Sequence, residues 1–304
     1  MRLLTRSDFD GLICAVLLKE ADVMDEWKFV HPKDVQDGIV EVTDQDILAN
    51  VPYVEGVGLW FDHHSSEEER VGFDFEFKGA SKNYKSCARV IWEFYGGKER
   101  FPQFDTMMDF VDKCDSADFT PEEIDNPTGW ILLSFVMDPR TGLGRYKDYR
   151  ISNYQLMMDL VEACRTMDIE AILELEDVKE RTERYFNHHD AFRDMVRRNS
   201  KVYDNVVVTD LRNEREIFTG NRFVVYALYP QVNISMQIMW GLRKQNIVFT
   251  VGHSILNKTS KTDVGSMLLG YGGGGHRTVG TCQVSVFKAD QIRWDLIAQM
   301  RKDG

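Results

Sequence analysis

The first 65 residues alternate short apolar runs with helical patterns, and few folds accommodate that rhythm. Residues 11–20 carry a helical apolar stripe, and extended apolar runs occur at residues 2–4, 27–30, 47–49 and 57–61. A β-α-β order of this kind predicts a parallel sheet with helices on its faces. Because ligands collect at the carboxyl ends of parallel strands, polar residues directly after these runs are the first candidates for a site.

The remainder of the chain predicts a helical part followed by a second α/β domain. Helical patterns fill residues 104–195, and the charge-rich segment 172–198 predicts one long solvent-facing helix that bridges two domains. A closing helix near residues 290–301 follows a series of strand-like runs at 205–210, 223–229, 233–240, 247–251 and 281–286. We therefore expect a parallel-sheet domain with its helical part at 1–180, a linker helix at 181–200 and a smaller mixed α/β domain at 201–304.

The charge balance restricts the ligands that the surface can attract. The 49 acidic and 37 basic side chains give a formal net charge of −12, which disfavours a long nucleic acid duplex but not a short anion in a local pocket. No apolar stretch reaches eighteen residues, so we expect no membrane association and a cytoplasmic location. A reducing compartment also fits five scattered cysteines without a C-x-x-C pair, namely Cys14, Cys87, Cys114, Cys164 and Cys282.

A pair of carboxylates follows the first strand-like run, in the sequence Asp8-Phe9-Asp10-Gly11. Side chains two residues apart diverge in an extended chain, but at a strand-to-helix turn followed by glycine both can converge on a cation. The same acids also suit the N-terminus of the following helix, where a carboxylate accepts main-chain N–H groups. The pair alone leaves both interpretations open.

Two histidines follow the strand-like run 57–61, in the sequence Asp62-His63-His64. An aspartate beside imidazoles offers mixed nitrogen and oxygen donors, which suit manganese, iron or zinc better than calcium. Adjacent histidines also occur on surfaces without a function, and His188 with His189, on a charged helical segment, fit that interpretation. The position at the end of a buried strand favours a metal site for His63 and His64.

Two further segments add to these pairs, and the first of them would be discounted on its own. Asp115 lies in an acidic stretch, residues 112–118, and such a stretch at a helix end is usually solvated. A glycine run, residues 272–275, precedes His276 and Arg277, and its main-chain N–H groups can wrap an anion to which both side chains donate. A flexible turn is the less favoured alternative, because the run lies between an apolar helical segment, residues 264–269, and a strand, with a histidine and an arginine attached.

These four segments occur in the order, and at roughly the spacing, of the DHH phosphoesterases that carry a DHH-associated C-terminal domain, and the chain resembles that family over nearly its whole length. The family includes RecJ-like nucleases, oligoribonucleases, phosphatases of 3′-phosphoadenosine 5′-phosphate, cyclic-dinucleotide phosphodiesterases and exopolyphosphatase-like proteins. The residues that carry the resemblance are Asp8, Asp10, Gly11, Asp62, His63, His64, Asp115, Gly273, Gly274, Gly275 and His276.

The resemblance also implies roles for individual residues. In the family, a pair of manganese-type divalent ions activates a water that attacks phosphorus, and this chain would bind one or two such ions, Mn²⁺, Mg²⁺ or another divalent ion. By similarity Asp8 would belong to one metal, and the other would be held by Asp10, His63 and Asp115. His64 would face the scissile phosphate, and Asp62 would orient its neighbours. The far end of the substrate would be held by Asn257, Gly273, Gly274, Gly275, His276 and Arg277.

Two positions depart from the family pattern. Leu4 stands where the family usually has a histidine, and Asn50 stands where a bridging aspartate usually ends a strand. Asn50 offers a metal a neutral amide oxygen but no charge to screen two dications from each other. If that strand aligns differently, Asp44 or Asp46 would serve instead. The sequence therefore predicts one well-held metal and a second that is weak or arrives with substrate.

The leading functional prediction is a metal-dependent phosphoesterase that hydrolyses short oligonucleotides or small nucleotide phosphates. An exopolyphosphatase-like hydrolase is one alternative, because polyphosphate presents the same anionic end group. The departures at Leu4 and Asn50 motivate another, a nucleotide-binding regulatory protein with a degraded metal centre. The sequence leaves the substrate, the metal and the oligomeric state open, a homodimer included.

Overall fold

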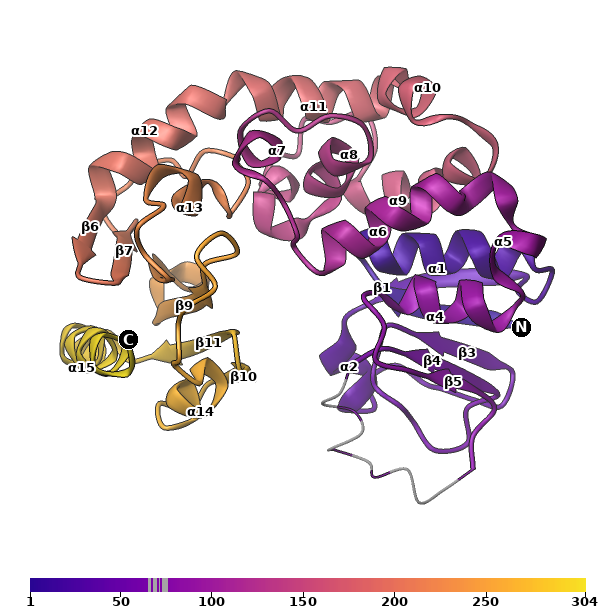
Figure 1. Ribbon diagram of the computed structural model, residues 1–304, viewed down its shortest axis with the longest axis horizontal. Helices are drawn as coiled ribbons and strands as arrows, with labels where there is room; N and C mark the ends of the chain where they lie inside the picture. Colours follow the sequence, from indigo (N-terminus) through magenta and orange to yellow (C-terminus); the bar gives the residue numbers. More distant parts are fainter. Residues whose placement is uncertain (65–66, 68–69, 71, 73–75) are drawn as a thin grey trace. The chain divides into compact units, whose positions relative to one another are not determined.

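Five parallel strands near the N-terminus form one sheet in the computed structural model, in the order β2-β1-β3-β4-β5 (Figure 1). The structure describes residues 1–64, 67, 70, 72 and 76–304. The expected parallel sheet is confirmed. Strand β5 was not expected, because it has only three small residues without an apolar pattern. The strands are β1 (Arg2–Arg6), β2 (Glu26–Val30), β3 (Asp46–Ala49), β4 (Leu59–Asp62) and β5 (Gly79–Ser81).

Both faces of this sheet are covered, as is usual for a parallel sheet. Side chains alternate along β1, so that Leu3 packs into the larger core with α1 (Phe9–Glu20) while Leu4 packs with Trp60 on the other face. Helix α2 (Pro32–Gln36) contributes Val35 to that second face. The helical layer over the larger core is completed by α4 (Cys87–Phe94), α5 (Gly97–Arg100), α6 (Asp105–Asp115), α8 (Gly129–Met137), α9 (Asn153–Thr166) and α10 (Ile169–Glu174).

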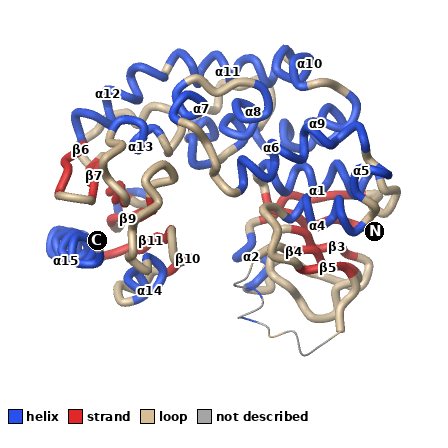
Figure 2. The backbone as a smooth tube through the Cα atoms, viewed as in Figure 1, coloured by secondary structure: helices blue, strands red, loops and turns tan. Residues whose placement is uncertain are grey.

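The chain divides into two compact units. Each contains both helices and strands (blue and red in Figure 2). The first comprises Met1–Asp118 and Pro127–Arg184, and the second comprises Phe119–Asn126 and Tyr185–Gly304. The division falls inside helix α11 (Glu176–Asn187), within the segment expected to link two domains. None of the helices in the described part of the chain combines the length and the apolar character that a membrane crossing requires.

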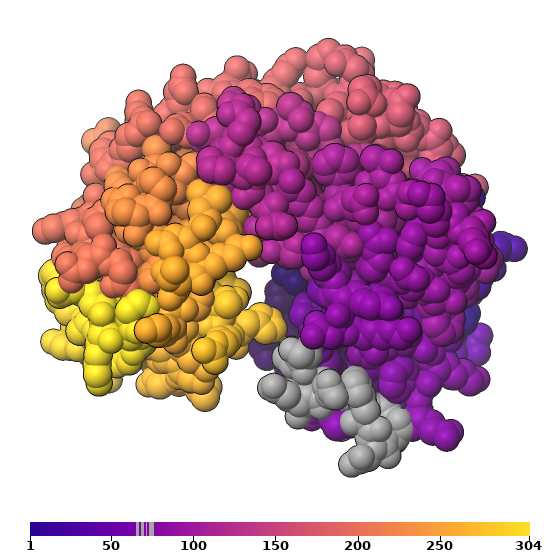
Figure 3. Space-filling model, viewed as in Figure 1, coloured from indigo at the N-terminus to yellow at the C-terminus, as the bar shows by residue number. Residues whose placement is uncertain are grey.

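The second unit contains a mixed sheet in the order β10-β11-β9-β8-β7-β6, in which β7 and β8 pair in parallel and the other neighbours are antiparallel. Its strands are β6 (Ser200–Tyr203), β7 (Val206–Asp210), β8 (Ile234–Trp240), β9 (Ile247–His253), β10 (Gly274–His276) and β11 (Val279–Val284). Helices α14 (Val264–Leu269) and α15 (Ala289–Asp303) pack on one face, and the outer side of α15 is exposed (yellow in Figure 3). The expected mixed α/β architecture is confirmed.

Two secondary-structure predictions were wrong. Segment 172–198 is not one solvent-facing helix, because α11 and α12 (His189–Asn199) are separate helices and bury side chains such as Arg181 and Tyr185. Residues 223–229 form helix α13 (Val224–Leu228) rather than a strand, because a short continuous apolar run does not distinguish a buried strand from a buried helix. Asn221 begins that turn by accepting the N–H of Phe223 at 2.9 Å. Helix α7 (Pro121–Asp125) also belongs to the second unit.

The pairing of β4 with β5 depends on the missing side chain of Gly79. Gly79 has a φ of 117°, and a Cβ there would lie 2.0 Å from the carbonyl oxygen of Trp60. We expect Gly79→Ala to lower the free energy of unfolding by about 3 kcal/mol, because the substitution adds a clash to an unfavourable φ.

Gly56 provides the matched control, because it has a φ of 86° but nothing within 4 Å of the same position. Gly56→Ala should therefore lower the free energy of unfolding by only about 1–2 kcal/mol. Urea unfolding of both variants measures the difference. Equal losses would show that the close approach to Trp60 contributes nothing.

Candidate metal centre

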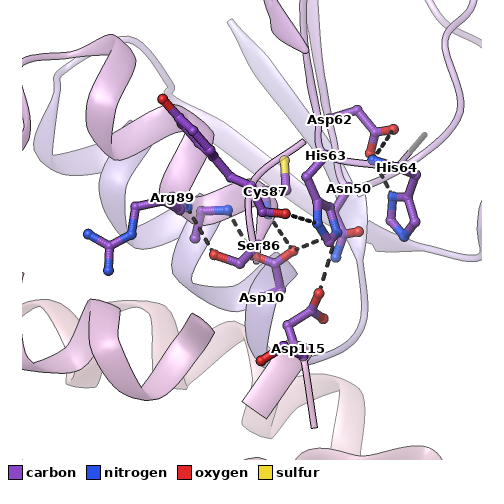
Figure 4. Close-up of polar contacts among 12 residues, drawn as sticks. Asp10, Asn50, Asp62, His63, His64, Ser86, Cys87, Arg89 and Asp115 are labelled. Carbon is purple, nitrogen blue, oxygen red and sulfur yellow. Dashed lines mark hydrogen bonds and ion pairs between the residues drawn. The ribbon is translucent and has the colours of Figure 1, made fainter. Parts of the chain in front are cut away.

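The carboxyl edge of the parallel sheet collects the acids and histidines singled out in the sequence (Figure 4). β1 leads to Asp8 and Asp10 at the start of α1, and β4 ends at Asp62, directly before the two histidines. Asn50 follows β3 between them and adopts a left-handed φ of 56°, which asparagine tolerates. Asp115, the last residue of α6, completes the group. Residues far apart in the sequence therefore meet at one edge.

Asp10 lies buried against the N-terminus of α4, where only 2% of the residue is exposed. Its oxygens accept the main-chain N–H of Cys87 at 2.9 Å and that of Ala88 at 2.7 Å. These are the first residues of a helix that Ser86 caps, and helix N-termini favour a carboxylate. Burial nevertheless raises the pKa of Asp10 above its ordinary value, so a cation beside the carboxylate would stabilise its charged form.

His63 directs one ring nitrogen at two carboxylates. Its Nδ1 lies 3.2 Å from the carbonyl oxygen of Tyr84, which can only accept, so the tautomer with its proton on Nδ1 satisfies this contact and leaves the lone pair on Nε2. Nε2 lies 3.8 Å from Asp10 Oδ2 and 3.4 Å from Asp115 Oδ2. It is buried and has no hydrogen-bond partner among the residues that the structure describes. An unpartnered imidazole nitrogen between two carboxylates is the arrangement expected of a metal ligand.

Asp10, His63 and Asp115 together fit a divalent cation. One donor atom of each lies within 4.8 Å of the other two. The Asp115 side chain is 28% exposed, which leaves a solvent approach to the cluster. Partial burial and the carboxylates of Asp10 and Asp8 hold the pKa of Asp115 well above its ordinary value, so the acids repel one another until a cation is present. One imidazole nitrogen and two carboxylate oxygens suit manganese, iron or zinc.

Asp62 and His64 form a second pair beside this cluster. Asp62 is fully buried at the end of β4, and its Oδ1 lies 2.9 Å from His64 Nδ1, while its Oδ2 accepts the His64 main-chain N–H at 3.2 Å. Burial alone would lower the pKa of His64, but the hydrogen bond and the charge of Asp62 raise it overall above the ordinary value. Asp62 therefore both orients the imidazole and favours its charged form.

Asp8 and Asn50 lie beside the three-residue cluster without joining it. Asp8 Oδ1 accepts the N–H of Gly11 at 2.9 Å and Asn50 Nδ2 at 3.2 Å, and Oδ2 pairs with Arg6 Nε at 2.9 Å. The helix-capping interpretation of Asp8 is therefore realised. Asn50 Oδ1 is buried and accepts no hydrogen bond from any residue that the structure describes, so it remains available as a neutral ligand.

Two positions considered from the sequence lie away from this edge. Asp46 begins β3 at the opposite edge, where it binds Arg2 at 2.7 Å and the N–H of Thr43 at 2.7 Å. The alternative alignment that uses Asp44 or Asp46 as a ligand is therefore wrong. Leu4 packs with Trp60 on the face of the sheet opposite α1.

The glycine run of the second unit is partly a strand rather than a flexible turn. Gly274–His276 forms β10, which pairs with β11. A Cβ at Gly273 would lie 2.3 Å from the carbonyl oxygen of Thr281, and one at Gly275 would lie 2.3 Å from that of Val279. Close approach to β11 therefore requires these glycines.

The other residues expected to bind substrate lie near this hairpin or in the loop after β9. His276 and Arg277 are exposed, and Asn257 is half-buried and donates to the carbonyl oxygen of Gln231 at 3.2 Å.

The carboxylate cradle at α4 was not anticipated from the sequence. Ser86 before the mostly apolar segment 87–92 is an ordinary helix-start signal and would have located α4. Nothing along the chain, however, indicates that the first N–H groups of this helix meet Asp10, 77 residues away from Cys87. The contact of His63 with the Tyr84 carbonyl group was not predicted for the same reason.

Comparisons with known proteins relate this geometry to a family. Neither a scan against protein-family models nor a search of curated proteins gave a match. Among solved structures, a pGpG-specific phosphodiesterase, PggH from Vibrio cholerae, is 50% identical over 100% of this chain and 99% of its own, with a TM-score of 0.86. The chain belongs to the DHH phosphoesterase family. The resemblance seen in the sequence is confirmed.

More distant structures share the fold of this DHH phosphoesterase. An exopolyphosphatase-related protein from Bacteroides fragilis is 14% identical, with 98% of this chain and 91% of its own covered and a TM-score of 0.52. RecJ from Thermus thermophilus, solved in complex with Mn²⁺, is 11% identical, with 99% of this chain and 52% of its own covered and a TM-score of 0.51. At this level of identity the likeness concerns the fold.

Removal of one carboxylate from the cluster should abolish stabilisation of this DHH phosphoesterase by a divalent ion. At a Mn²⁺ concentration 100-fold above the dissociation constant, wild-type protein stripped with chelator should gain about 2.7 kcal/mol of stability. Asp115→Asn should lose most of this gain. Calorimetric melting with and without Mn²⁺ measures the shift in Tm.

Asp109 is the matched control, because it lies on the same helix and is 82% exposed. Asp109→Asn should keep the wild-type response to Mn²⁺. An unchanged Mn²⁺ response in Asp115→Asn would contradict the assignment of the cluster.

Proposed function

We propose that this protein hydrolyses the phosphodiester bond of short 5′-phosphorylated oligonucleotides, with pGpG as the first substrate to test, in a reaction that requires a divalent ion. The observation that carries the proposal is the convergence of Asp10, His63 and Asp115 within 4.8 Å, in a chain half identical over its full length to a pGpG-specific phosphodiesterase. The net charge of −12 supports the choice of a short substrate over a long duplex.

Asp10, His63 and Asp115 would hold the ion, for which we favour Mn²⁺ and keep Mg²⁺ as the alternative. When bound, such an ion polarises a phosphoryl oxygen and lowers the pKa of water from 15.7 to near 7, a change of about 12 kcal/mol, against about 3–5 kcal/mol for a lone general base. The orphaned Nε2 of His63 and the raised pKa values of both acids support this assignment.

One ion should be held tightly. Both oxygens of Asp8 already have partners, and the neighbouring Asn50 brings no charge, so these two residues would hold a second ion weakly or only with substrate. Titration of chelator-treated protein with Mn²⁺ should accordingly give one tight equivalent per chain, and two tight equivalents would contradict this part of the proposal.

His64 would assist the reaction by donating a hydrogen bond to the scissile phosphate. Asp62 binds Nδ1, which orients the ring so that Nε2 is the nitrogen through which the imidazole can donate a proton. The raised pKa of His64, which Asp62 imposes against the effect of burial, supports a charged donor. Asp62 acts on substrate only through His64 and is a positioning residue.

The second unit would hold the end of the substrate away from the scissile bond, through Asn257, Gly273, Gly274, Gly275, His276 and Arg277. The exposed His276 and Arg277, at the edge of a hairpin built from close-packed glycines, support this role. A cytoplasmic location suits the five free cysteines. The homodimer considered from the sequence receives no support, and the proposal does not need it.

The alternative of a degraded metal centre loses its main support, because the three donors of the cluster are in place despite Leu4 and Asn50. An exopolyphosphatase-like activity stays open, because the same cluster would accept a polyphosphate end. We expect Mn²⁺-dependent release of mononucleotide from pGpG, and little release from long DNA. Incubation with pGpG, other 5′-phosphorylated dinucleotides, 3′-phosphoadenosine 5′-phosphate, cyclic dinucleotides, polyphosphate and long DNA tests this by chromatography.

Asp115→Asn is the negative control for this panel, since a contaminating nuclease would persist in its preparation. Binding of every compound without turnover by wild-type protein would favour the regulatory alternative. Release of phosphate from polyphosphate alone would favour the exopolyphosphatase-like one.

Replacement of Arg277 should separate binding from chemistry. Arg277→Ala removes an exposed guanidinium distant along the chain from the acid cluster, so KM for pGpG should rise about tenfold or more while kcat changes little. Lys302→Ala, which removes an exposed cation near the end of α15, is the control and should change neither constant. A fall in kcat at unchanged KM would argue against a binding role.

A further inference from the structure

Two guanidinium groups from separate elements lie within electrostatic range of the acids of the first unit, Arg6 by its ion pair with Asp8 and Arg140 by its interaction with Asp8 and Asp115. Arg6 is the last residue of β1, two residues before Asp8, and Arg140 lies in a short 3-10 turn, Pro139–Thr141, after α8. Neither was singled out in the sequence, and neither is a donor in the three-residue metal cluster. Their contacts indicate what they can bind.

The contact with Asp8 fixes Arg6 in place and leaves most of its donors unused. Arg6 Nε lies 2.9 Å from Asp8 Oδ2, while the other oxygen of Asp8 is held by Gly11 and Asn50. The Arg6 side chain is 39% exposed, and no further hydrogen bond or ion pair joins it to a residue in the described part of the chain. A guanidinium anchored through Nε presents its remaining N–H groups as a planar fork, which matches the oxygens of a phosphate.

Arg140 repeats this arrangement from the other element. Its Nε lies 2.7 Å and 3.0 Å from the two oxygens of Asp138, and its side chain is 49% exposed. Burial would lower the pKa of Arg140, but Asp138, with Asp8 and Asp115 further away, raises it overall. Asp8 and Asp115 therefore lie within electrostatic range of this second guanidinium as well.

The acids of the cluster would repel an anionic substrate unless positive charge lies nearby. A divalent ion would balance the charges of Asp10 and Asp115, but Asp8 would still repel an anionic substrate unless Arg6 offsets its charge. The ion pairs of the two arginines should contribute little to the stability of the fold, because exposed ion pairs generally do. Arg6, paired with Asp8, and Arg140, within electrostatic range of Asp8 and Asp115, add positive charge where an anion would arrive.

We propose that Arg6 and Arg140 bind the anionic oxygens of the substrate's scissile phosphodiester group beside the metal cluster. This inference rests on the proposed function for the identity of the substrate, but not for the binding of phosphate itself. Arg6 and Arg140 would thereby act on substrate directly, whereas Asp8 and Asp138 position them.

The test compares affinities for a cation and for an anion, because a substrate-binding role and a structural role move them differently. The variants are Arg6→Gln and Arg140→Gln, and Arg165→Gln is the control, since Arg165 pairs with Glu20 and Glu162 away from the cluster and loses the same charge. Mn²⁺ affinity is measured by titration of chelator-treated protein. Binding of inorganic phosphate next to the ion is measured by Mn²⁺-induced relaxation of its ³¹P nucleus, which reports only phosphate close to Mn²⁺.

We expect Arg6→Gln and Arg140→Gln each to weaken phosphate binding about tenfold or more, while Mn²⁺ binds at least as tightly as in wild type, because a repelling charge is removed. Arg165→Gln should match wild type in both measurements. Arg6→Lys, which keeps the charge but not the fork, should lie between wild type and Arg6→Gln.

Unchanged phosphate binding in both glutamine variants, or no Mn²⁺-dependent relaxation in wild type, would overturn the inference. A parallel loss of Mn²⁺ and phosphate affinity would assign the arginines a structural role. Arginine-dependent phosphate binding in a protein that hydrolyses nothing in the panel would sink the proposed function and leave this inference standing. Hydrolysis of pGpG with phosphate affinity and KM unchanged in both variants would do the reverse.

Discussion

The buried carboxylate of Asp10 against the first N–H groups of α4 is the interaction on which the site depends. The N-terminus of α4 is itself tied to β4, because Cys87 Sγ donates to the carbonyl oxygen of Phe61 at 3.2 Å. It is also tied to α6, because Ser86 donates to Asp112 at 2.7 Å. Asp112 precedes Asp115 by three residues, about one helical turn. One helix end therefore holds α1, β4 and α6 in the positions from which the three donors converge.

This arrangement favours the binding of an ion but lowers the stability of the fold. Two acids with raised pKa values share a small volume with an imidazole nitrogen that has no hydrogen-bond partner among the described residues. A core selected for stability alone would pair or remove such groups, because a buried polar atom without a partner is unfavourable. Their retention at a sheet edge, with solvent access through Asp115, is the pattern of a binding site and not of structural packing.

The sequence predicted the parallel sheet and the acids at its edge because both follow from local patterns. Apolar runs locate strands, and residues just after parallel strands must share one edge. The prediction of a strand at residues 223–229 was wrong, because a short apolar run fits a buried helix as well as a strand. The hydrogen bonds of Asp10 and the positions of the two arginines were not predicted, for another reason. An Arg6 or Ser86 looks ordinary along the chain, and only tertiary contacts reveal its neighbours.

The departures from the family pattern become coherent once Arg6 is considered with them. Leu4 points into the core on the far face of the sheet, and Asn50 turns its amide nitrogen toward Asp8. Asp8 is thereby surrounded by hydrogen-bond donors, with Gly11 and Arg6 as the others, and has become an anchor for a guanidinium. The protein itself then supplies positive charge at a place where an acid, a neutral amide and a leucine would offer none. In a chain with a net charge of −12, such local charge would admit a small phosphate ester while the rest of the surface repels longer polyanions.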